Sequence, residues 1–448
     1  MKTANTIAKR FFSVLLALAI TLGAFGVGML NASAEEAPIL AFGETYEGVC
    51  TEMNNSFSYR LVLPESGLVT VTFRSGAYFS YIKLYDDYEE IHSSLSSMRD
   101  DDHCGADLSL RLKAGAYRLT VKACYHLDVM AGNVYGPYTL TAAFESANET
   151  FEESLTTHND RKDTAFDYTV GTNVQGQIGQ LNDPVDVYRF ELTEPGVLRI
   201  ELKNPETGCY CHLKISEADK TLYNTASTEK EGHQYVTRHA ISLIPGIYYL
   251  EVASPYASFP YTFTTSFTPV AETFAEKQGA LLNDRATAPA ISLGESYTGF
   301  IAENDSVDLY RFTVTEPVEL TLRFVSGGKP TDVDLKTYEF ANASASDYKE
   351  EKREWRVAEP GVYFINVTAW IAEAPYGAYA FILYQRGDTD HNGSITAADA
   401  RAALRMAVGL EPAEEGTLNF YAADYDCNGM ITAADARSIL RAAVGLEP

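Results

Sequence analysis

The chain has little of what marks most enzymes and most disulfide-stapled domains. Its 448 residues include 6 cysteines and 2 tryptophans, which is too few cysteines for a framework of disulfides. Neither His-Glu-x-x-His nor Gly-x-Ser-x-Gly occurs, so the motifs of zinc peptidases and of many serine hydrolases are missing. After residue 34, no apolar run is long enough to cross a bilayer. We identify no catalytic residues in the sequence.

Positive charge is also scarce. The chain has 35 Lys and Arg against 61 Asp and Glu, and its formal net charge is −26. Three of the basic residues lie in the first 34 positions, so the remainder is more acidic still. Proteins that bind nucleic acid need basic faces, and we therefore exclude nucleic acid as a partner. The hydrophobic share of 46% is ample for packed domains.

Residues 1–34 have the features of a secretory signal peptide. A basic start precedes an apolar run from Phe11 to Leu30, and Ala32-Ser33-Ala34 fits a cleavage box. An uncleaved membrane anchor is the alternative, because the apolar run is long enough to span. We predict cleavage, and hence a secreted, extracellular protein with no membrane contact afterwards.

Five of the six cysteines fall into two groups, and neither group predicts a clear site. Cys50, Cys104 and Cys124 lie in one region, where one pair could close. Cys209, Cys211 and His212 lie within four residues of an apparent strand. That is poor geometry for surrounding a metal, so we interpret them as ordinary strand residues, with a metal site as the alternative.

Between residues 35 and 386 one pattern of strands occurs three times. Gly and Pro turns separate short stretches of period-two alternation, which predicts antiparallel sandwiches over residues 35–147, 148–270 and 271–386. Asp186 and Asp308 precede the second and third copies of one triplet by two residues, whereas Phe57 precedes the first. The equivalent positions are Tyr59-Arg60-Leu61, Tyr188-Arg189-Phe190 and Tyr310-Arg311-Phe312, and, after a Gly-containing turn, Tyr117, Tyr248 and Tyr363.

These repeated residues predict structural roles. On a strand, the Tyr and Phe of Tyr-Arg-Phe point to one face and the Arg to the other. Tyr248 and its equivalents follow a tight turn, from which the phenol could bond a backbone group across a corner. The order of motifs resembles the bacterial pre-peptidase C-terminal (PPC) domain family, most clearly in the second and third copies. The resemblance implies non-catalytic sandwiches of the kind appended to secreted hydrolases.

Two further features of the first repeat were weighed for function, and only the second permits a functional interpretation. Ser80-Tyr-Ile-Lys83 matches Ser-x-x-Lys, but that motif needs a helix and this segment is predicted as a strand. The aromatic residues around it cannot all face inward, and an exposed row could stack on sugar rings; packing in the core is the alternative. They are Tyr78, Phe79, Tyr81, Tyr85 and Tyr88.

The last sixty or so residues contain one calcium-loop pattern twice, at an offset of 36 positions. A loop with oxygen ligands at positions 1, 3, 5, 7 and 12 and Gly at position 6 can surround Ca²⁺. Two full matches in register predict two calcium ions. The ligands are Asp388, Asp390, Asn392, the Ser394 carbonyl and Asp399 in the first loop, and Asp424, Asp426, Asn428, the Met430 carbonyl and Asp435 in the second.

Each loop leads into a predicted helix. Thr396 and Asp399 are spaced as an N-cap and its N3 partner. Ala400, Leu404 and Val408 are predicted to form one apolar stripe. A strand, rather than a helix, precedes Asp388, and Asp replaces the usual Glu at position 12, so both features depart from an ordinary EF-hand.

Residues 387–448 resemble a type I dockerin, a duplicated calcium loop plus helix that binds cohesin modules of scaffold proteins. The resemblance implies that the cohesin is read by loop positions 10 and 11 and by basic helix positions. Many dockerins carry a Ser-Thr-like pair where this chain has alanines. The residues at loop positions 10 and 11 are Ala397 and Ala398 in the first copy and Ala433 and Ala434 in the second, and Arg405 and Arg441 match the basic helix position. Arg401 and Arg437 lie one turn earlier on a neighbouring strip that we also expect to contact the partner; ordinary solvated helix charge is the alternative for these arginines.

The sequence therefore predicts a mainly β fold, with three tandem antiparallel β-sandwich domains followed by a small α-helical calcium-binding dockerin. As a function we expect a secreted component of a cellulosome-like complex, held at the cell surface through its scaffold. Its sandwiches would be spacers or bind polysaccharide or another extracellular protein. The alternatives are a divergent glycoside hydrolase and an accessory protein that holds a peptidase.

Overall fold

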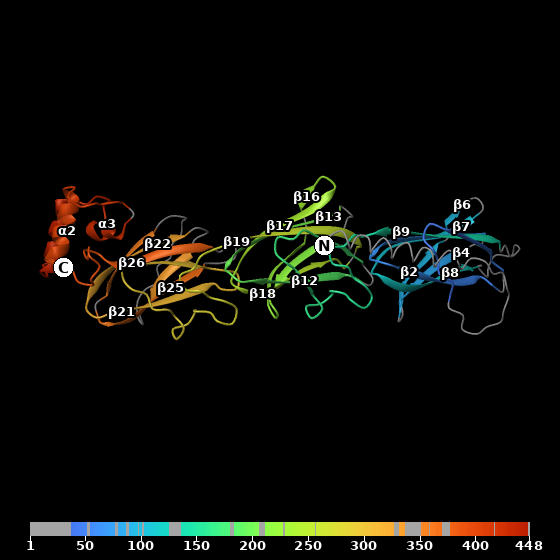
Figure 1. Cartoon of the computed structure of the whole chain (residues 1–448), viewed down its shortest axis with the longest axis horizontal. Helices are drawn as coiled ribbons and strands as arrows, with labels where there is room; N and C mark the ends of the chain where they lie inside the picture. The colour runs from blue at the N-terminus through green and yellow to red at the C-terminus, as the bar shows by residue number, and fades with distance from the viewer. Residues whose placement is uncertain are drawn as a thin grey trace, which may run out of the picture.

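The chain is mainly β, with several sheets and a small helical region at its C-terminal end. Three pairs of sheets follow one another along the long axis of the molecule, and the helices lie at one end (Figure 1). The predicted signal peptide lies outside the described residues. The computed structural model describes residues 37–51, 54–76, 79–86, 89–96, 98–100, 103–124, 136–179, 183–205, 211–226, 229–255, 257–326, 331–336, 351–357, 359–369, 377–415 and 417–446.

In the first sandwich, the sheet β1-β9-β3-β7-β6 faces the sheet β2-β8-β4-β5. Both sheets contribute side chains to one core, because alternate residues along each strand point inward. The strands are β1 (Thr45–Val49), β2 (Ser56–Leu63), β3 (Gly67–Ser75), β4 (Phe79–Tyr85), β5 (Glu90–Ser96), β6 (Met98–Asp100), β7 (His103–Leu112), β8 (Gly115–Cys124) and β9 (Pro137–Ser146).

The second sandwich pairs the sheet β10-β12-β18-β14-β15 with the sheet β11-β19-β13-β17-β16, again around one core. Its strands are β10 (Phe166–Asp167), β11 (Val174–Ile178), β12 (Val185–Leu192), β13 (Gly196–Pro205), β14 (His212–Ser216), β15 (Thr221–Ala226), β16 (Glu229–Glu231), β17 (Gln234–Leu243), β18 (Gly246–Ala253) and β19 (Phe259–Pro269).

The third sandwich is built from the sheets β20-β26-β22-β24 and β21-β25-β23, with its own core. Its strands are β20 (Ser296–Phe300), β21 (Val307–Val314), β22 (Val318–Ser326), β23 (Thr331–Lys336), β24 (Glu351–Val357), β25 (Gly361–Ala369) and β26 (Ala378–Gln385). The strand predicted just before Asp388 is β26, so this prediction is confirmed.

The prediction of purely antiparallel sheets was wrong in one detail that all three repeats share. The segment entering each sandwich pairs in parallel with the strand that carries the Tyr-Arg motif. The pairs are Ile39 with Arg60, Phe166 with Tyr188, and Ala290 with Arg311. These contacts are one or two residues long, too short for a period-two pattern to reveal them.

The repeated motif organises a buried polar contact in each core. The hydroxyl oxygens of Tyr188 and Tyr261 lie 2.6 Å apart, and Tyr261 also donates to the Asp186 carboxylate. Tyr310, Tyr379 and Asp308 repeat this arrangement in the third sandwich. In the first sandwich Tyr59 and Tyr138 are 2.9 Å apart, and Phe57 takes the place of the acid. The first and third residues of each triplet, Tyr followed by Leu61, Phe190 or Phe312, face the core, as predicted.

A second repeated contact confirms the corner role of the tyrosine after the turn. The Tyr117 hydroxyl donates to the Lys113 carbonyl at 2.9 Å, and Tyr248 donates to the Ile244 carbonyl at 2.6 Å. Tyr363 donates to the Glu359 carbonyl at 2.7 Å. In each case the phenol satisfies a carbonyl four residues upstream, which fixes the turn that precedes β8, β18 or β25.

We expect Tyr261→Phe to destabilise the second sandwich by about 1–3 kcal/mol, because the buried Asp186 carboxyl loses its donor. Tyr138→Phe is the matched control, since the first sandwich has no acid there, and it should cost about 1 kcal/mol or less. Hydrogen exchange read peptide by peptide reports the two sandwiches separately in the full chain. Equal loss of protection in both variants would contradict a distinct role for Asp186.

The C-terminal region contains α2 (Ala397–Ala407), α3 (Leu418–Ala423) and α4 (Ala433–Ala443). Thr396 is the N-cap of α2 and Thr432 is the N-cap of α4. Each forms a capping box with the Asp three residues later, as the sequence predicts. The small core consists of Ala400, Ala403, Met406, Ala423, Ala436 and Ile439.

The predicted apolar stripe of α2 was wrong. Ala400 is buried, but Leu404 is 43% exposed and Val408 is 61% exposed. The buried face runs instead through Ala400, Ala403 and Met406. The buried stripe follows an i, i+3, i+6 spacing instead of the predicted i, i+4, i+8 spacing.

Candidate functional site

The first loop brings its acidic side chains together. Carboxylate oxygens of Asp388, Asp390 and Asp399 lie within 4.8 Å of one another. Gly393 has φ +87°, a conformation that favours glycine, and its N–H donates to Asp388 Oδ2 at 2.8 Å. The Asn392 N–H donates to both Asp388 and Asp390. The chain therefore wraps around the point where the three carboxylates meet.

The second loop repeats this geometry at the matching positions. Asp424, Asp426 and Asp435 converge within 4.8 Å, and Gly429 has φ +85°. The Gly429 N–H donates to Asp424 Oδ2 at 2.9 Å. Asn392 and Asn428 each accept a bond from the N–H two residues on, at Ser394 and Met430. The three carboxylates and the Asn side chain of each predicted calcium loop thus have the same arrangement in both copies.

The donor set suits a hard divalent cation. Asp388 and Asp399 are buried, as are Asp424 and Asp435, and no described Lys or Arg forms an ion pair with them. Burial, with the nearby Asp399 carboxylate adding to it, raises the pKa of Asp388 despite two backbone N–H bonds. Converging carboxylates without a positive partner are costly, and Ca²⁺ prefers such oxygen ligands.

The residue at position 12 has a second role that links each loop to its helix. Asp399 Oδ2 accepts bonds from the N–H and the hydroxyl of Thr396, both at 2.8 Å. Its other oxygen accepts from the Thr389 N–H at 2.9 Å. A single carboxylate therefore caps α2 and faces the loop, so filling the loop and ordering the helix are coupled.

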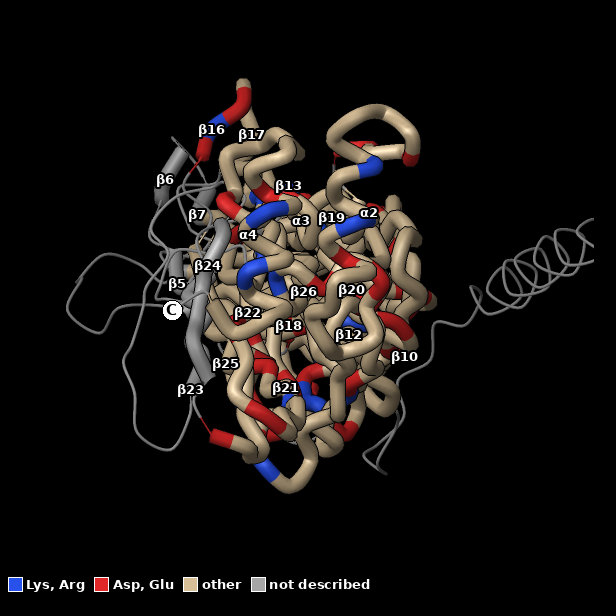
Figure 2. Tube along the Cα trace, turned by 90° about the vertical axis from the view of Figure 1, so that its left-hand side faces the viewer, with Lys and Arg blue, Asp and Glu red and all other residues tan. Residues whose placement is uncertain are grey.

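All eight residues predicted to contact a partner are exposed. They lie at the start and on the outer sides of α2 and α4, where basic positions are seen in the end-on view (Figure 2). The third sandwich contacts other parts of this region: Gly387 donates to the Ala422 carbonyl at 2.9 Å, and the guanidinium of Arg323 lies over Tyr421. Arg405 bonds Glu411 and Arg441 bonds the Leu446 carbonyl.

An exposed set of apolar side chains, which the sequence interpretation missed, accompanies these residues. Each exposed member of the first copy has a counterpart 36 positions later with nearly the same exposure. The pairs are Leu404 (43%) and Leu440 (45%), Val408 (61%) and Val444 (60%), and Leu410 (66%) and Leu446 (63%). The sequence signal for this surface was the repetition of the same large apolar residues in both copies. Large apolar residues that stay exposed in both copies mark a contact surface.

Two further acidic clusters lie inside the sandwiches and were also missed. One consists of Glu153, Asp160 and Asp183, and the other of Glu276, Asp305 and Asp308. In the second, burial raises the pKa of Glu276 to about 10 and that of Asp308 to about 7. One feature of the sequence could have indicated these clusters. An Asp stands three residues before the Asp of the repeated Asp-x-Tyr motif, Asp183 before Asp186 and Asp305 before Asp308.

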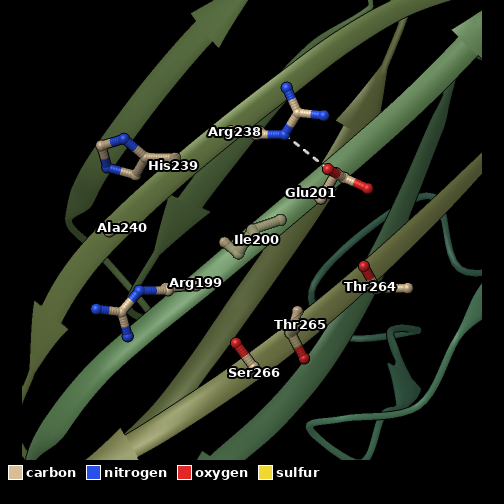
Figure 3. A pocket seen from close by; sticks show the side chains of 9 residues that line it. All are labelled: Arg199, Ile200, Glu201, Arg238, His239, Ala240, Thr264, Thr265 and Ser266. Carbon is tan, nitrogen blue, oxygen red and sulfur yellow. Dashed lines mark hydrogen bonds and ion pairs between the residues drawn. The ribbon is translucent and has the colours of Figure 1, made fainter.

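A broad hollow of about 450 Å³ lies on the outer face of the β13-β17-β19 sheet. Arg199 and Arg238 flank it, and Arg238 pairs with Glu201 at 2.7 Å (Figure 3). Thr264 and Ser266 supply hydroxyls on its floor. His239 also lines the hollow, and its imidazole ring stacks on Tyr223. Charged groups, hydroxyls and apolar carbon all line this hollow, and none of its lining residues is Phe, Tyr or Trp.

The structure gives no support to the weaker motifs. Ser80 is buried on β4 and Lys83 pairs with Glu90, so Ser-x-x-Lys spans opposite faces of a strand, as predicted. Tyr81 and Tyr85 share the outward parity of that strand, and Arg118 lies over Tyr85. Tyr78, Tyr88 and the side chain of Phe79 are outside the described part of the structure. Cys50 and Cys211 are buried free thiols, and Cys209 is not described.

No family model matches the chain, and no curated protein matches it. Similar solved structures include the pre-peptidase C-terminal domain of collagenase from Bacillus anthracis, at 20% identity over 24% of this chain and 100% of that one, with a TM-score of 0.19. The CUB1-EGF-CUB2 domain of human MASP-1/3 covers 50% of this chain and 99% of its own at 9% identity and a TM-score of 0.15.

A third similar structure is described as the triple jelly roll fold and turret assembly in an archaeal virus, at 8% identity, covering 77% of this chain and 89% of that one, with a TM-score of 0.17. At scores this low, none of the three likenesses bears on what this chain does. Within the described part of the chain, no helix is long and apolar enough to cross a membrane.

Proposed function

We propose that residues 387–448 are a calcium-dependent docking module of the type I dockerin kind, which attaches the chain to a cohesin module of a scaffold protein. The sandwiches then serve as spacer or binding modules for polysaccharide or another extracellular protein. In this proposal the mature chain is a secreted component of a cellulosome-like complex, and two calcium ions occupy the two loops.

The observation that carries the proposal is the duplicated exposed face. Each copy presents two small alanines, two arginines and three large apolar side chains that the fold leaves uncovered. Alanines permit close approach of a partner, exposed Leu and Val supply apolar area, and arginines at the rim suit carboxylates. A purely structural calcium module would have no need to expose the same apolar residues twice.

The loops account for calcium dependence through the helix caps. Since Asp399 and Asp435 face the loops and also cap α2 and α4, calcium fixes the carboxylates that set the start of each helix. The alanine pair at positions 10 and 11 opens that same helix. Removing calcium should therefore disturb the first residues that a cohesin would contact.

The experiment is a binding screen of the full mature chain against a panel of immobilised cohesins, with calcium and with EGTA. We expect calcium-dependent capture by at least one cohesin. The same protein is tested on insoluble polysaccharides and for hydrolysis of polysaccharides and casein. Hydrolysis without capture by any cohesin would favour the enzyme alternative and contradict the docking proposal.

A further inference from the structure

The hollow on the second sandwich lies over the outward face of the sheet that contains β13. The apolar residues of this strand alternate into the core, so Arg199, Glu201 and Lys203 point outward. The strand pairing extends the first two of these residues into rows across the sheet. Ala240, Arg199 and Ser266 form one row, and Arg238, Glu201 and Thr264 form the next.

The hollow forms where small side chains flank a long one. Ala240 on β17 and Ser266 on β19 lie on either side of Arg199, and all three residues line the hollow (Figure 3). The outward side chains of β19 add a line of hydroxyl groups along this strand, because they alternate with residues of the core. They are Thr262, Thr264, Ser266 and Thr268.

The charges on this face are not balanced. Glu201 pairs with Arg238 at 2.7 Å and also with Lys203, and Arg238 pairs in addition with Glu231 at 2.5 Å. Arg199 is exposed and donates to a threonine hydroxyl of β19 at 3.2 Å. Within the described part of the chain, no carboxylate forms an ion pair with it. An excess of positive charge therefore gathers here, on a chain whose net charge is −26.

The other two repeats have a different residue at this place. Counting from the first residue of β3, β13 and β22, Thr70 and Thr321 occupy the position of Arg199. Thr70 lies between a serine and an alanine. Thr321 is buried, and Tyr384 beside it stacks on Tyr421 of α3, so the helical region covers that face. The arginine is therefore particular to the second sandwich, where a hollow takes the place of a covering element.

The groups around the hollow match those of an acidic sugar. A guanidinium binds a carboxylate through two parallel hydrogen bonds, and serine and threonine hydroxyls both donate to and accept from sugar hydroxyls. Among the described lining residues there is no Phe, Tyr or Trp, so a neutral sugar would find no aromatic ring to stack on. At about 0.15 M salt, charges more than roughly 8 Å apart are largely screened, so the local cations outweigh the net charge of the chain.

An acidic peptide fits this face less well than a sugar chain. Peptides that bind sheets add a strand to a free edge or place side chains in pockets. Strand β13 is paired on both sides, with β17 and with β19, so it offers no free edge. The hollow lies across the face of the sheet and has hydroxyls along β19, which favours a polymer with many hydroxyl groups.

We propose that this face of the second sandwich binds an acidic polysaccharide, with Arg199 on a uronic acid carboxylate and the hydroxyls of β19 on neighbouring sugar hydroxyls. The inference rests on the proposed function in one respect, since it names the ligand for the binding role given there to the sandwiches. The site lies outside residues 387–448, so its binding does not need calcium.

The test measures binding of the full mature chain to immobilised polygalacturonate, a polymer of a uronic acid, in EGTA at about 0.15 M salt. We expect binding to polygalacturonate and none to immobilised hydroxyethylcellulose, which is neutral. Arg199→Glu should lower the affinity by about tenfold or more, because it places a like charge against the carboxylate. Arg311→Glu makes the same change at an exposed arginine of β21 and should leave the affinity unchanged.

A second variant fills the hollow without removing the arginine. Ala240→Glu places a longer, negatively charged side chain beside Arg199 and should also lower the affinity by about tenfold or more. Hydrogen exchange in β13 checks that each variant keeps its fold. Absence of binding to polygalacturonate, or equal affinities for Arg199→Glu and Arg311→Glu, would overturn the proposal.

Two further readouts separate this proposal from its neighbours. Binding to immobilised poly-glutamate without binding to polygalacturonate would overturn the proposal and assign an acidic protein as the ligand. Cohesin capture is measured with calcium, whereas polysaccharide binding is measured in EGTA. Failure of the polysaccharide site would therefore leave cohesin capture unchanged, and failure of cohesin capture would leave binding to polygalacturonate unchanged.

Discussion

Chelating calcium in the full mature chain should abolish hydrogen-exchange protection across α2, α3 and α4 while the cores of the sandwiches stay protected. The helical region has a small core made largely of alanines, which stabilises it weakly without metal. Converging carboxylates in both loops also repel one another. Binding energy therefore becomes folding energy, and we expect protection to fall by about 100-fold or more when calcium is removed.

Two variants of the first loop sharpen this prediction. Asp399→Ala removes a carboxylate that serves both loop and cap, whereas Thr396→Ala removes only the cap, typically about 1 kcal/mol. Asp399→Ala should therefore lower calcium affinity much more than Thr396→Ala, as measured by calorimetric titration. Full protection of the helices in EGTA would show that the region folds without metal, and the two loops would then be acidic turns.

Disabling both docking faces should abolish cohesin binding, whereas disabling one should leave it largely intact. The two faces match residue by residue in type and exposure, so a cohesin that binds one should bind the other. Ala397→Glu with Ala398→Glu removes one of two equivalent modes and should lower affinity about twofold. Adding Ala433→Glu and Ala434→Glu should lower it by more than about 100-fold, because four charges would then lie in a desolvated contact.

The control for this series is Ala413→Glu, which adds the same charge at an exposed position between the helices and should leave affinity unchanged. Binding by surface-based kinetics at fixed calcium reports all four proteins. Complete loss from one single-face variant would contradict the two-way surface, and the duplication would then serve folding and calcium alone.

The parts of the structure that local patterns specify were predictable from the sequence. Period-two alternation and repeated turns predicted paired sheets, and loop spacing identified the three carboxylates that converge in each loop. The capping boxes at Thr396 and Thr432 also follow from local spacing. In each of these cases the interacting groups lie within a few residues of one another, or repeat in register.

The parts that depend on contacts between distant segments were not predictable. The buried ion pairs of Lys113 had no signal in the sequence, because its carboxylate partners lie 40 to 70 positions later and in the next sandwich. Leu404 and Val408 were predicted to form an apolar stripe with buried Ala400, because periodicity cannot tell an apolar face that packs inward from one that stays exposed. Both cases concern the surfaces of folded units, where the pattern of a single element carries little information.

The measurement that tests the central claim most directly is the affinity of the full mature chain for its cohesin as free calcium is lowered. We expect affinity to fall by about 1,000-fold, or roughly 4 kcal/mol, and the fall to coincide with loss of exchange protection in α2 and α4. An affinity that stays the same in EGTA, while the helices remain protected, would contradict a docking surface built by calcium.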